Sequence, residues 1–361
     1  MRLGVGAAVV GSEVIRGDIS ISGDEIEAVG LAPPGTGWAV PGFVDLQVNG
    51  FLGIDFLDAD AADLAGAGAG LAQTGVVAYQ PTLITGPPGT TVRAAAEIAR
   101  AARNGGPRII GIHLEGPFLS PLRAGAHPLS YLRDPDWLFL EPILAAGRVT
   151  MVTLAPELPG AVDLIARLAS TGVVVSLGHS DATADQAGIG FDAGARTVTH
   201  LFNAMRPFSH RDPGLAGVAL SRSDVSLGVI ADGVHVSPEA LLPVWRAAAT
   251  RTYIVTDAIA AAGMGPGLWT LGEVEVEVEA GAARRHDGTL AGSVGTMDES
   301  FRHLISLGVP LADVVAMTSL NARRLMGMTD GTLAPGGPAD IVVLDDGYCV
   351  SNTLIGGVGM S

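Results

Sequence analysis

The sequence predicts a (β/α)8 barrel of the TIM type, with a small β domain built from both chain ends. Two observations predict this fold: eight short runs rich in β-branched residues recur along the chain, and Ala-rich helical stretches separate several of them. Strands that alternate with helices indicate a parallel sheet, and eight such units indicate a closed barrel. An open doubly wound sheet is the alternative, but no Gly-x-Gly-x-x-Gly motif joins a strand to a helix, so a dinucleotide site has no support.

The elements divide the chain into three segments. Residues 1–40 alternate apolar and polar positions between Gly and Asp turns, and we assign them to the small β domain. Residues 41–335 form the predicted barrel, and residues 336–361 return to β structure and complete the small domain. The predicted barrel strands are 42–48, 75–81, 108–114, 149–155, 172–178, 196–202, 225–231 and 252–258. Helices are predicted at 59–72, 91–103, 161–169, 239–249, 296–307 and 311–326, and a β-hairpin at 271–290.

Composition excludes several classes of function. The formal net charge of −16 argues against nucleic acid and against an anionic membrane surface as partners. All 21 basic residues are arginine, which excludes Schiff-base chemistry and a carbamylated lysine between two metals. The N-terminus lacks the apolar core of a signal peptide, no apolar run is long enough to span a membrane, and Cys349 has no partner for an internal disulfide. We therefore expect a cytoplasmic protein.

Polar side chains occur where the predicted strands end, which is where barrel enzymes carry their chemistry. Glu115, His179 and His200 end the third, fifth and sixth strands. Two imidazoles and a carboxylate can hold a catalytic Zn²⁺ and leave a position for water, and the same set suits Fe²⁺. Each histidine could instead be a hydrogen-bonded core residue, but three aligned candidates favour a metal site.

Other candidates follow neighbouring strands. Asp257 ends the eighth strand, where a carboxylate could act as general base and then acid, or could merely cap a helix. His127, His235 and Arg211 lie in loops after strands and are candidate substrate contacts. An arginine fork suits a phosphate group, although Arg211 could equally form a surface ion pair with a nearby aspartate.

Several segments closely resemble the N-acetylglucosamine-6-phosphate deacetylase family of the amidohydrolase superfamily. The resemblance covers essentially the whole chain, and its most specific blocks contain HLEGPF and THLFNAM. The segments that carry it are GIHLEGPFLSPLRAGAHP (111–128), SLGHSDAT (176–183), VTHLFNAM (198–205), DPGLAGVAL (212–220), IADGVHV (230–236), VTDAIAAAG (255–263) and LAGS (290–293), with PGFVDLQVNG (41–50) and 319–345 fitting as well.

The resemblance implies a (β/α)8 barrel with a small β-sandwich formed by both chain termini, and it implies a role for each candidate residue. It makes Glu115, His179 and His200 the metal ligands and Asp257 the general base and acid, while His127 polarises the amide carbonyl. Further residues would bind the sugar phosphate: Ala126, Asn203, Ala204, Arg211, Asp232, Gly233, Val234, His235, Leu290, Ala291 and Gly292. Within this set Arg211 and His235 would hold the phosphate, and Arg211 would reach a neighbouring subunit, which implies a homodimer.

The first strand departs from the pattern of many superfamily members, which carry His-x-His there. This chain has Gln47 and Asn49, and neutral amides are poor ligands. We therefore expect one divalent metal in each site, Zn²⁺ before Fe²⁺, Co²⁺ or Mn²⁺.

The reaction that the resemblance implies is hydrolysis of N-acetyl-D-glucosamine 6-phosphate to glucosamine 6-phosphate and acetate, in amino-sugar catabolism or cell-wall recycling. The galactosamine epimer as substrate, a different amidohydrolase, and a catalytically dead barrel that binds a sugar phosphate stay open as alternatives.

Overall fold

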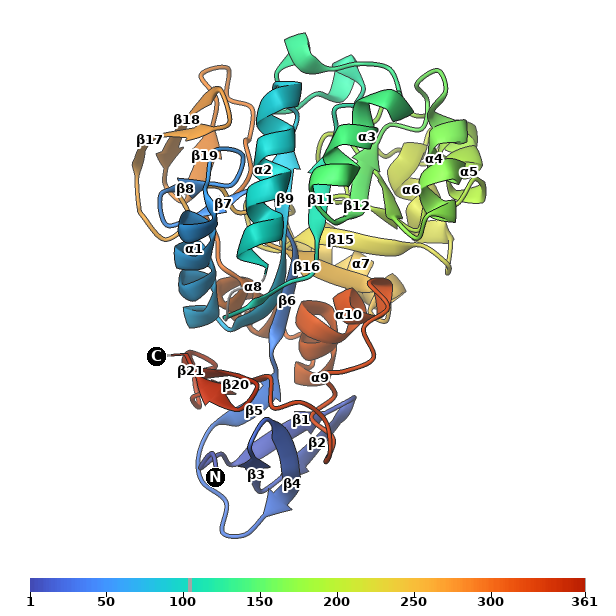
Figure 1. The fold of residues 1–361 in the computed structure, drawn as a ribbon. Helices are drawn as coiled ribbons and strands as arrows, with labels where there is room; N and C mark the ends of the chain where they lie inside the picture. Colours follow the sequence, from blue (N-terminus) through green and yellow to red (C-terminus); the bar gives the residue numbers. More distant parts are fainter. Residues whose placement is uncertain (103–105, 361) are drawn as a thin grey trace.

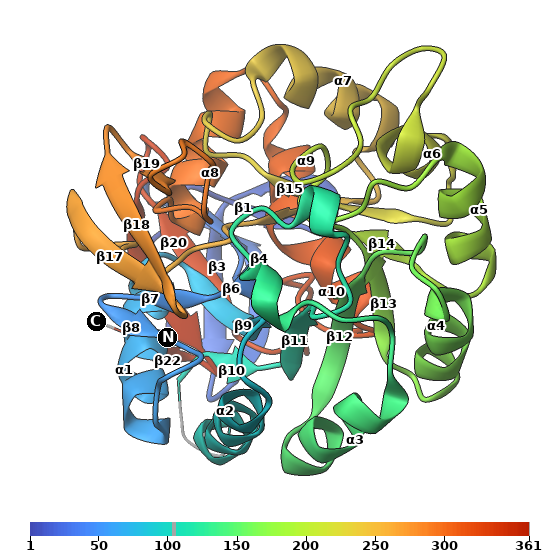
Figure 2. The ribbon, with the colours of Figure 1, turned by 90° about the horizontal axis from the view of Figure 1, so that it is seen from above.

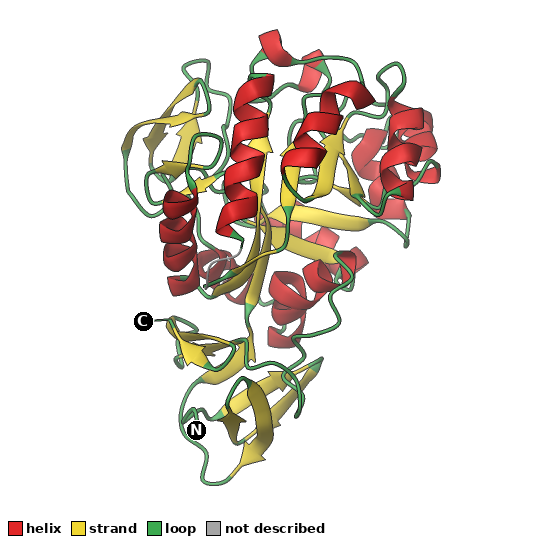
Figure 3. Ribbon diagram, viewed as in Figure 1, coloured by secondary structure: helices red, strands yellow, loops and turns green. Residues whose placement is uncertain are grey.

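The computed structural model describes residues 1–102 and 106–360 and has two parts (Figure 1). The barrel fills the upper part of the view, and a smaller β region that contains both termini lies beneath it (Figure 3). Position 103, at the end of one predicted helix, and position 361, at the end of the small β domain, lie outside the described residues. Within the described part of the chain, every helix is too short or too polar to cross a lipid bilayer.

The barrel confirms all eight predicted strands, which are parallel and follow one another in chain order. The strands are β6 (Phe43–Val48), β9 (Val76–Ile84), β11 (Ile112–Glu115), β12 (Val149–Leu154), β13 (Val174–Leu177), β14 (Thr197–Val198), β15 (Ser226–Ile230) and β16 (Thr252–Val255), with the short β10 (Arg108–Ile109) beside β9. The ends of the sheet meet where the Asp257 amide donates to the Gln47 carbonyl at 2.9 Å and Val48 bridges Ala258. Barrel strands are buried on both faces and are therefore continuous apolar runs, which is why they could be predicted from the sequence.

The helices pack around the outside of the barrel (Figure 2). They are α1 (Ala61–Gln73), α2 (Pro88–Ala101), α3 (Trp137–Ala146), α4 (Ala161–Ser170), α5 (Ala184–Asp192), α6 (Gly214–Ser221), α7 (Pro238–Ala248) and α8 (Met297–Ser306). Helices α3, α5 and α6 were not predicted from the sequence. Pro142 lies within α3, and α5 and α6 each contain two glycines. The helix predicted at 311–326 is a continuous helical run of α9 (Leu311–Val315), a π-helical turn (Ala316–Leu320) and α10 (Asn321–Leu325).

The excursion after the last barrel strand is larger than the predicted hairpin. It is a three-stranded antiparallel sheet of β17 (Gly267–Leu271), β18 (Val274–Glu279) and β19 (Ala282–Arg284). Ala280 and Gly281 form the turn that joins β18 to β19, and both residues have positive φ. Figures 1 and 2 show this sheet at the rim of the barrel, beside a small hairpin of β7 (Gly50–Phe51) and β8 (Ile54–Asp55).

Both chain ends build the small β region, as predicted. Its main sheet has the order β2 (Glu13–Arg16), β1 (Ala7–Val10), β5 (Trp38–Pro41), β20 (Ile341–Leu344), β21 (Val350–Ile355) and β22 (Val358–Gly359), with a separate hairpin of β3 (Asp18–Ser22) and β4 (Glu25–Leu31). Ile19 and Ile26 from the first part pack with Ile341 and Leu354 from the last. The region lies at the end of the barrel where the strands begin (Figure 1). The domain boundaries at residues 40 and 335 stay predictions.

Arg323 ties the end of the barrel domain to its first strand. This α10 side chain is 1% exposed, and its guanidinium pairs with Asp330 at 2.8 Å. It also donates to Ser319 Oγ at 3.2 Å and to the carbonyl of Gly42, directly before β6, at 3.4 Å. A buried charge is tolerated only when it is paired and hydrogen-bonded, and these partners supply both.

We predict that Arg323→Met lowers the free energy of unfolding by about 3 kcal/mol, because removing one partner leaves the other groups unpaired. The measurement is chemical denaturation followed by circular dichroism. Arg324→Met is the matched control, since Arg324 is exposed on the same helix and should change stability by less than about 1 kcal/mol. Equal losses for the two variants would contradict the role given to Arg323.

Candidate active site

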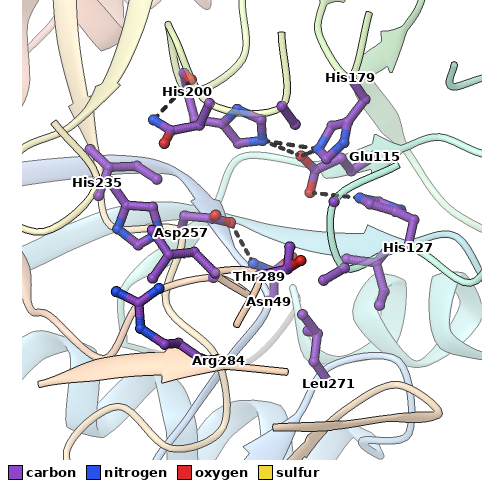
Figure 4. Close-up of a pocket in the computed structure, with 18 of the residues that line it drawn as sticks. Asn49, Glu115, His127, His179, His200, His235, Asp257, Leu271, Arg284 and Thr289 are labelled. Carbon is purple, nitrogen blue, oxygen red and sulfur yellow. Dashed lines mark hydrogen bonds and ion pairs between the residues drawn. The ribbon is translucent and has the colours of Figure 1, made fainter. Parts of the chain in front are cut away.

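A cavity of about 370 Å³ opens at the carboxyl ends of the barrel strands (Figure 4). Eleven of the residues singled out from the sequence line it: Glu115, Ala126, His127, His179, His200, Asn203, Ala204, His235, Asp257, Leu290 and Gly292. They come from strand ends and loops that are far apart in the chain. Closure of the barrel therefore brings most of the predicted site together.

Three of these side chains converge on one point. The Nε2 atoms of His179 and His200 each lie 3.1 Å from Glu115 Oε1 and 3.0 Å from each other. All three side chains are buried, and one donor atom from each lies within 4.8 Å of the others, close enough to hold a metal ion. We call these residues the Glu-His-His cluster.

The tautomer of His179 fits metal coordination. Its Nδ1 lies 2.9 Å from the backbone carbonyl of Arg123, and a carbonyl can only accept, so Nδ1 carries a proton. Because Nδ1 keeps its proton, Nε2 is the ring nitrogen that can exchange its hydrogen bond to Glu115 for a bond to a metal, as a metal ligand must. His179 and His200 also adopt left-handed backbone conformations, with φ of 47° and 31°. Such strained geometry is common at functional sites.

Charge is concentrated at the cluster. Burial favours the protonated form of Glu115, but the hydrogen bonds from His179 and His200 outweigh it and hold the pKa of this carboxyl well below its usual range. Burial likewise opposes a charged His200, yet its hydrogen bond to Glu115 raises the pKa of the imidazole. Glu115 is thus an ionised carboxylate in a buried pocket, which is suited to binding a cation.

Asp257 lies beside the cluster and is held by the two amides of the first strand. Its Oδ1 accepts from Asn49 Nδ2 at 2.7 Å and from Gln47 Nε2 at 3.0 Å. Gln47 Nε2 also lies 3.0 Å from Glu115 Oε1 and so joins the two carboxylates. Burial, followed by the charge of Glu115, raises the pKa of Asp257 to about 6. A carboxyl with a pKa near neutrality can both take and return a proton.

His127 presents a proton to the pocket. The backbone N–H of Thr85 lies 3.3 Å from His127 Nδ1, so this nitrogen accepts and the proton of the neutral ring is on Nε2. The Thr85 hydroxyl also contacts Nδ1, at 2.9 Å. Burial, assisted by the neighbouring His179, lowers the pKa of His127 to about 3, so the ring stays neutral at physiological pH. No short motif marked Thr85, which contacts His127 through both its backbone N–H and its hydroxyl.

The loop after β15 orients His235. Asp232 accepts hydrogen bonds from the amides of Val234 and His235 at 2.9 Å, and its Oδ2 lies 2.7 Å from His235 Nδ1. Burial disfavours the ionised form of Asp232, but the hydrogen bond from His235 prevails and lowers the pKa of the carboxyl. The loop therefore holds the His235 ring at the pocket wall opposite His127 (Figure 4).

Some predicted contacts lie outside the pocket lining. Asp232, Gly233 and Val234 precede His235 in the loop but do not line the pocket. Ala291 is buried between two lining residues in the chain, and Arg211 is exposed on the loop before α6. The lining also includes residues that the sequence analysis did not assign: Ile84, Gly125, Ile230, Leu271, Arg284, Gly288 and Thr289. Leu271 and Arg284 belong to the sheet after the last barrel strand, whose position beside the site no motif indicated.

Comparisons with known proteins agree with this geometry. The model of the amidohydrolase family matches residues 38–359. The N-acetylglucosamine-6-phosphate deacetylase of Homo sapiens is 40% identical over 338 residues, which cover 88% of this chain and 82% of the relative. The N-acetylgalactosamine-6-phosphate deacetylase of Escherichia coli O157:H7 is 38% identical over 325 residues, 88% of this chain and 86% of the relative.

The solved structures show the same relationship in three dimensions. A mutant N-acetyl-D-glucosamine-6-phosphate deacetylase of Mycobacterium smegmatis, in complex with N-acetyl-D-glucosamine-6-phosphate, superposes with a TM-score of 0.95 at 39% identity, covering 100% of this chain and 99% of that one. The Thermotoga maritima deacetylase gives a TM-score of 0.92 at 30% identity, covering 100% and 99%. This chain therefore belongs to the amidohydrolase family and, within it, to the N-acetylglucosamine-6-phosphate deacetylases.

Proposed function

We propose that this chain hydrolyses the acetamide of N-acetyl-D-glucosamine 6-phosphate to glucosamine 6-phosphate and acetate. The observation that carries the proposal is the Glu-His-His cluster next to Asp257, in a pocket large enough for a sugar. The related N-acetylglucosamine-6-phosphate deacetylases indicate that the substrate is a phosphorylated N-acetyl amino sugar. An intact set of ionisable groups argues against the alternative of an inactive sugar-phosphate binder.

The chain's own residues divide the chemistry between them. A divalent metal held by Glu115, His179 and His200 would polarise the acetyl carbonyl and lower the pKa of a water molecule. Asp257 takes the proton of the attacking water and then delivers it to the amine that leaves. His127 donates its Nε2 proton to the carbonyl oxygen, where negative charge develops. Gln47 and Asn49 keep the carboxylates of Glu115 and Asp257 in place.

We propose a single metal in each site, with Zn²⁺ before Fe²⁺, Co²⁺ or Mn²⁺. The N–H groups of Gln47 and Asn49 point at Asp257, and Gln47 also points at Glu115. An amide N–H has no lone pair to offer a cation. A second metal ion beside these carboxylates would therefore face N–H groups of the two amides and not ligand atoms. Two imidazoles with one carboxylate form a set that Zn²⁺ accepts.

We also propose the remaining substrate contacts. Ala126, Asn203, Ala204 and the loop from Leu290 to Gly292 surround the space beside the cluster and would contact the sugar. His235 would bind the phosphate. Arg211, exposed on its loop, would reach the pocket of a second copy in a homodimer. A cytoplasmic location and a role in amino-sugar catabolism or cell-wall recycling fit such a substrate.

Substrate choice tests the proposal directly. Purified, metal-loaded protein should release acetate rapidly from N-acetylglucosamine 6-phosphate and much more slowly from N-acetylglucosamine. N-acetylgalactosamine 6-phosphate belongs in the same assay, because a relative of similar identity has that name. Preference for the galactosamine epimer would replace the proposed substrate, and no release from any of the three would refute the deacetylase function.

The role of Asp257 gives a second prediction. We expect Asp257→Asn to lower kcat by about 10²- to 10⁴-fold, the usual effect of losing a general base. Binding of the sugar phosphate should persist, because the amide oxygen can still accept from Gln47 and Asn49. Single-turnover acetate release and calorimetric titration with glucosamine 6-phosphate measure the two effects. Near-normal turnover would rule out the assigned role.

The cluster gives a prediction about stability. A metal present at about a hundredfold its Kd stabilises the folded state by about 2.7 kcal/mol, so Zn²⁺ should raise the Tm of the chelated protein. His200→Ala removes one ligand and should abolish most of this rise in differential scanning fluorimetry. His286→Ala is the control, since its side chain is 77% exposed. The same rise in both variants would place the metal elsewhere.

A further inference from the structure

The pocket contains one arginine, Arg284, to which the proposed reaction gives no role. It is the last residue of β19, on the sheet that lies at the rim of the barrel. Its backbone is fixed by an antiparallel bridge to Leu290, a neighbouring lining residue. Figure 4 shows its guanidinium on the same side of the pocket as the imidazole of His235, away from His127.

The guanidinium of Arg284 keeps most of its hydrogen-bonding capacity. One N–H donates to the carbonyl of Gly288 at 2.9 Å. Glu277 is its partner across β18 and β19, yet Arg284 forms no ion pair with any carboxylate in residues 1–102 and 106–360. A guanidinium has five N–H donors in a rigid fork, so several remain for a ligand in the pocket.

An anionic substrate needs such a cation. The chain has a formal net charge of −16, and Glu115 and Asp257 add two buried carboxyl groups to the pocket itself. A phosphate that enters this field is repelled unless a local positive group opposes it. Arginine suits the task, because its planar fork binds phosphate oxygens in pairs.

The sheet that carries Arg284 is fastened to the loop that carries His127. Arg285 donates to the carbonyl of Gly125 at 3.1 Å, and the Tyr131 hydroxyl lies 3.2 Å from a carboxylate oxygen of Glu273. These contacts hold Arg284, at one side of the pocket, in a fixed position relative to His127, at the side where the acetyl group would bind. A sugar can lie between them with its acetamide toward the cluster and its phosphate toward Arg284 and His235.

We propose that Arg284 binds the phosphate of the substrate within its own chain and so selects phosphorylated over free amino sugars. The proposal rests on the function proposed above and deepens it. It gives every pocket a phosphate-binding cation of its own, separate from any contribution of Arg211 from a second copy.

Calorimetric titration with glucosamine 6-phosphate and steady-state acetate release test the proposal on the metal-loaded protein. Arg284→Gln should weaken glucosamine 6-phosphate binding and raise KM by about 10- to 100-fold, the scale of losing a hydrogen bond to a charged group, with kcat changed little. Arg284→Lys should recover part of the loss. Arg16→Gln, an exposed site on β2 in the small β region, is the control for net charge.

The outcomes separate this inference from the proposed function. Support requires that Arg284→Gln lose affinity for the phosphorylated compound while kcat/KM for free N-acetylglucosamine stays unchanged. Unchanged affinity in Arg284→Gln overturns the inference, and so does an equal loss for phosphorylated and free sugars. If the wild type releases acetate while the variant binds normally, only the inference fails. If the variant loses binding but the wild type releases no acetate, only the proposed function fails.

Discussion

The meeting of two imidazole nitrogens at one oxygen of Glu115 sets the arrangement of the whole barrel mouth. Glu115 ends β11, while His179 and His200 follow β13 and β14, so the curvature of the barrel brings the three side chains together. A buried carboxylate with two nitrogens facing it is costly unless a cation or protons occupy the space between them. The stability of the closed barrel, whose strands are buried on both faces, offsets this free-energy cost.

A layer of buried polar groups beneath the cluster supports it. The Nε2 atom of His113, two residues before Glu115, lies 2.7 Å from the Thr153 hydroxyl. The Thr153 hydroxyl in turn lies 2.6 Å from the hydroxyl of Thr199. Burial lowers the pKa of His113 to about 4, so the ring is neutral and can donate at one nitrogen and accept at the other. The neutral ring of His113 therefore adds no charge directly below the Glu-His-His cluster.

The sequence predicts this architecture well where the signal is local. Parallel strands appear as apolar runs, and chemistry-bearing residues at their carboxyl ends must converge, so Glu115, His179, His200 and Asp257 could be placed together before any coordinates. Helix α3 could not be predicted because Pro142 and an almost wholly apolar composition hide its period. The contributions of Thr85 and Arg284 depend on a backbone N–H and on a sheet that folds back over the pocket. Neither is encoded in a short motif.

The central claim is that a single metal, held by the Glu-His-His cluster, is required for hydrolysis. Its most direct test is to strip the protein with a chelator and titrate Zn²⁺ back while recording acetate release and bound metal in the same samples. The account predicts that activity rises in proportion to bound metal and reaches its plateau at one equivalent per chain. Full activity without metal, or a plateau only at two equivalents, would contradict it.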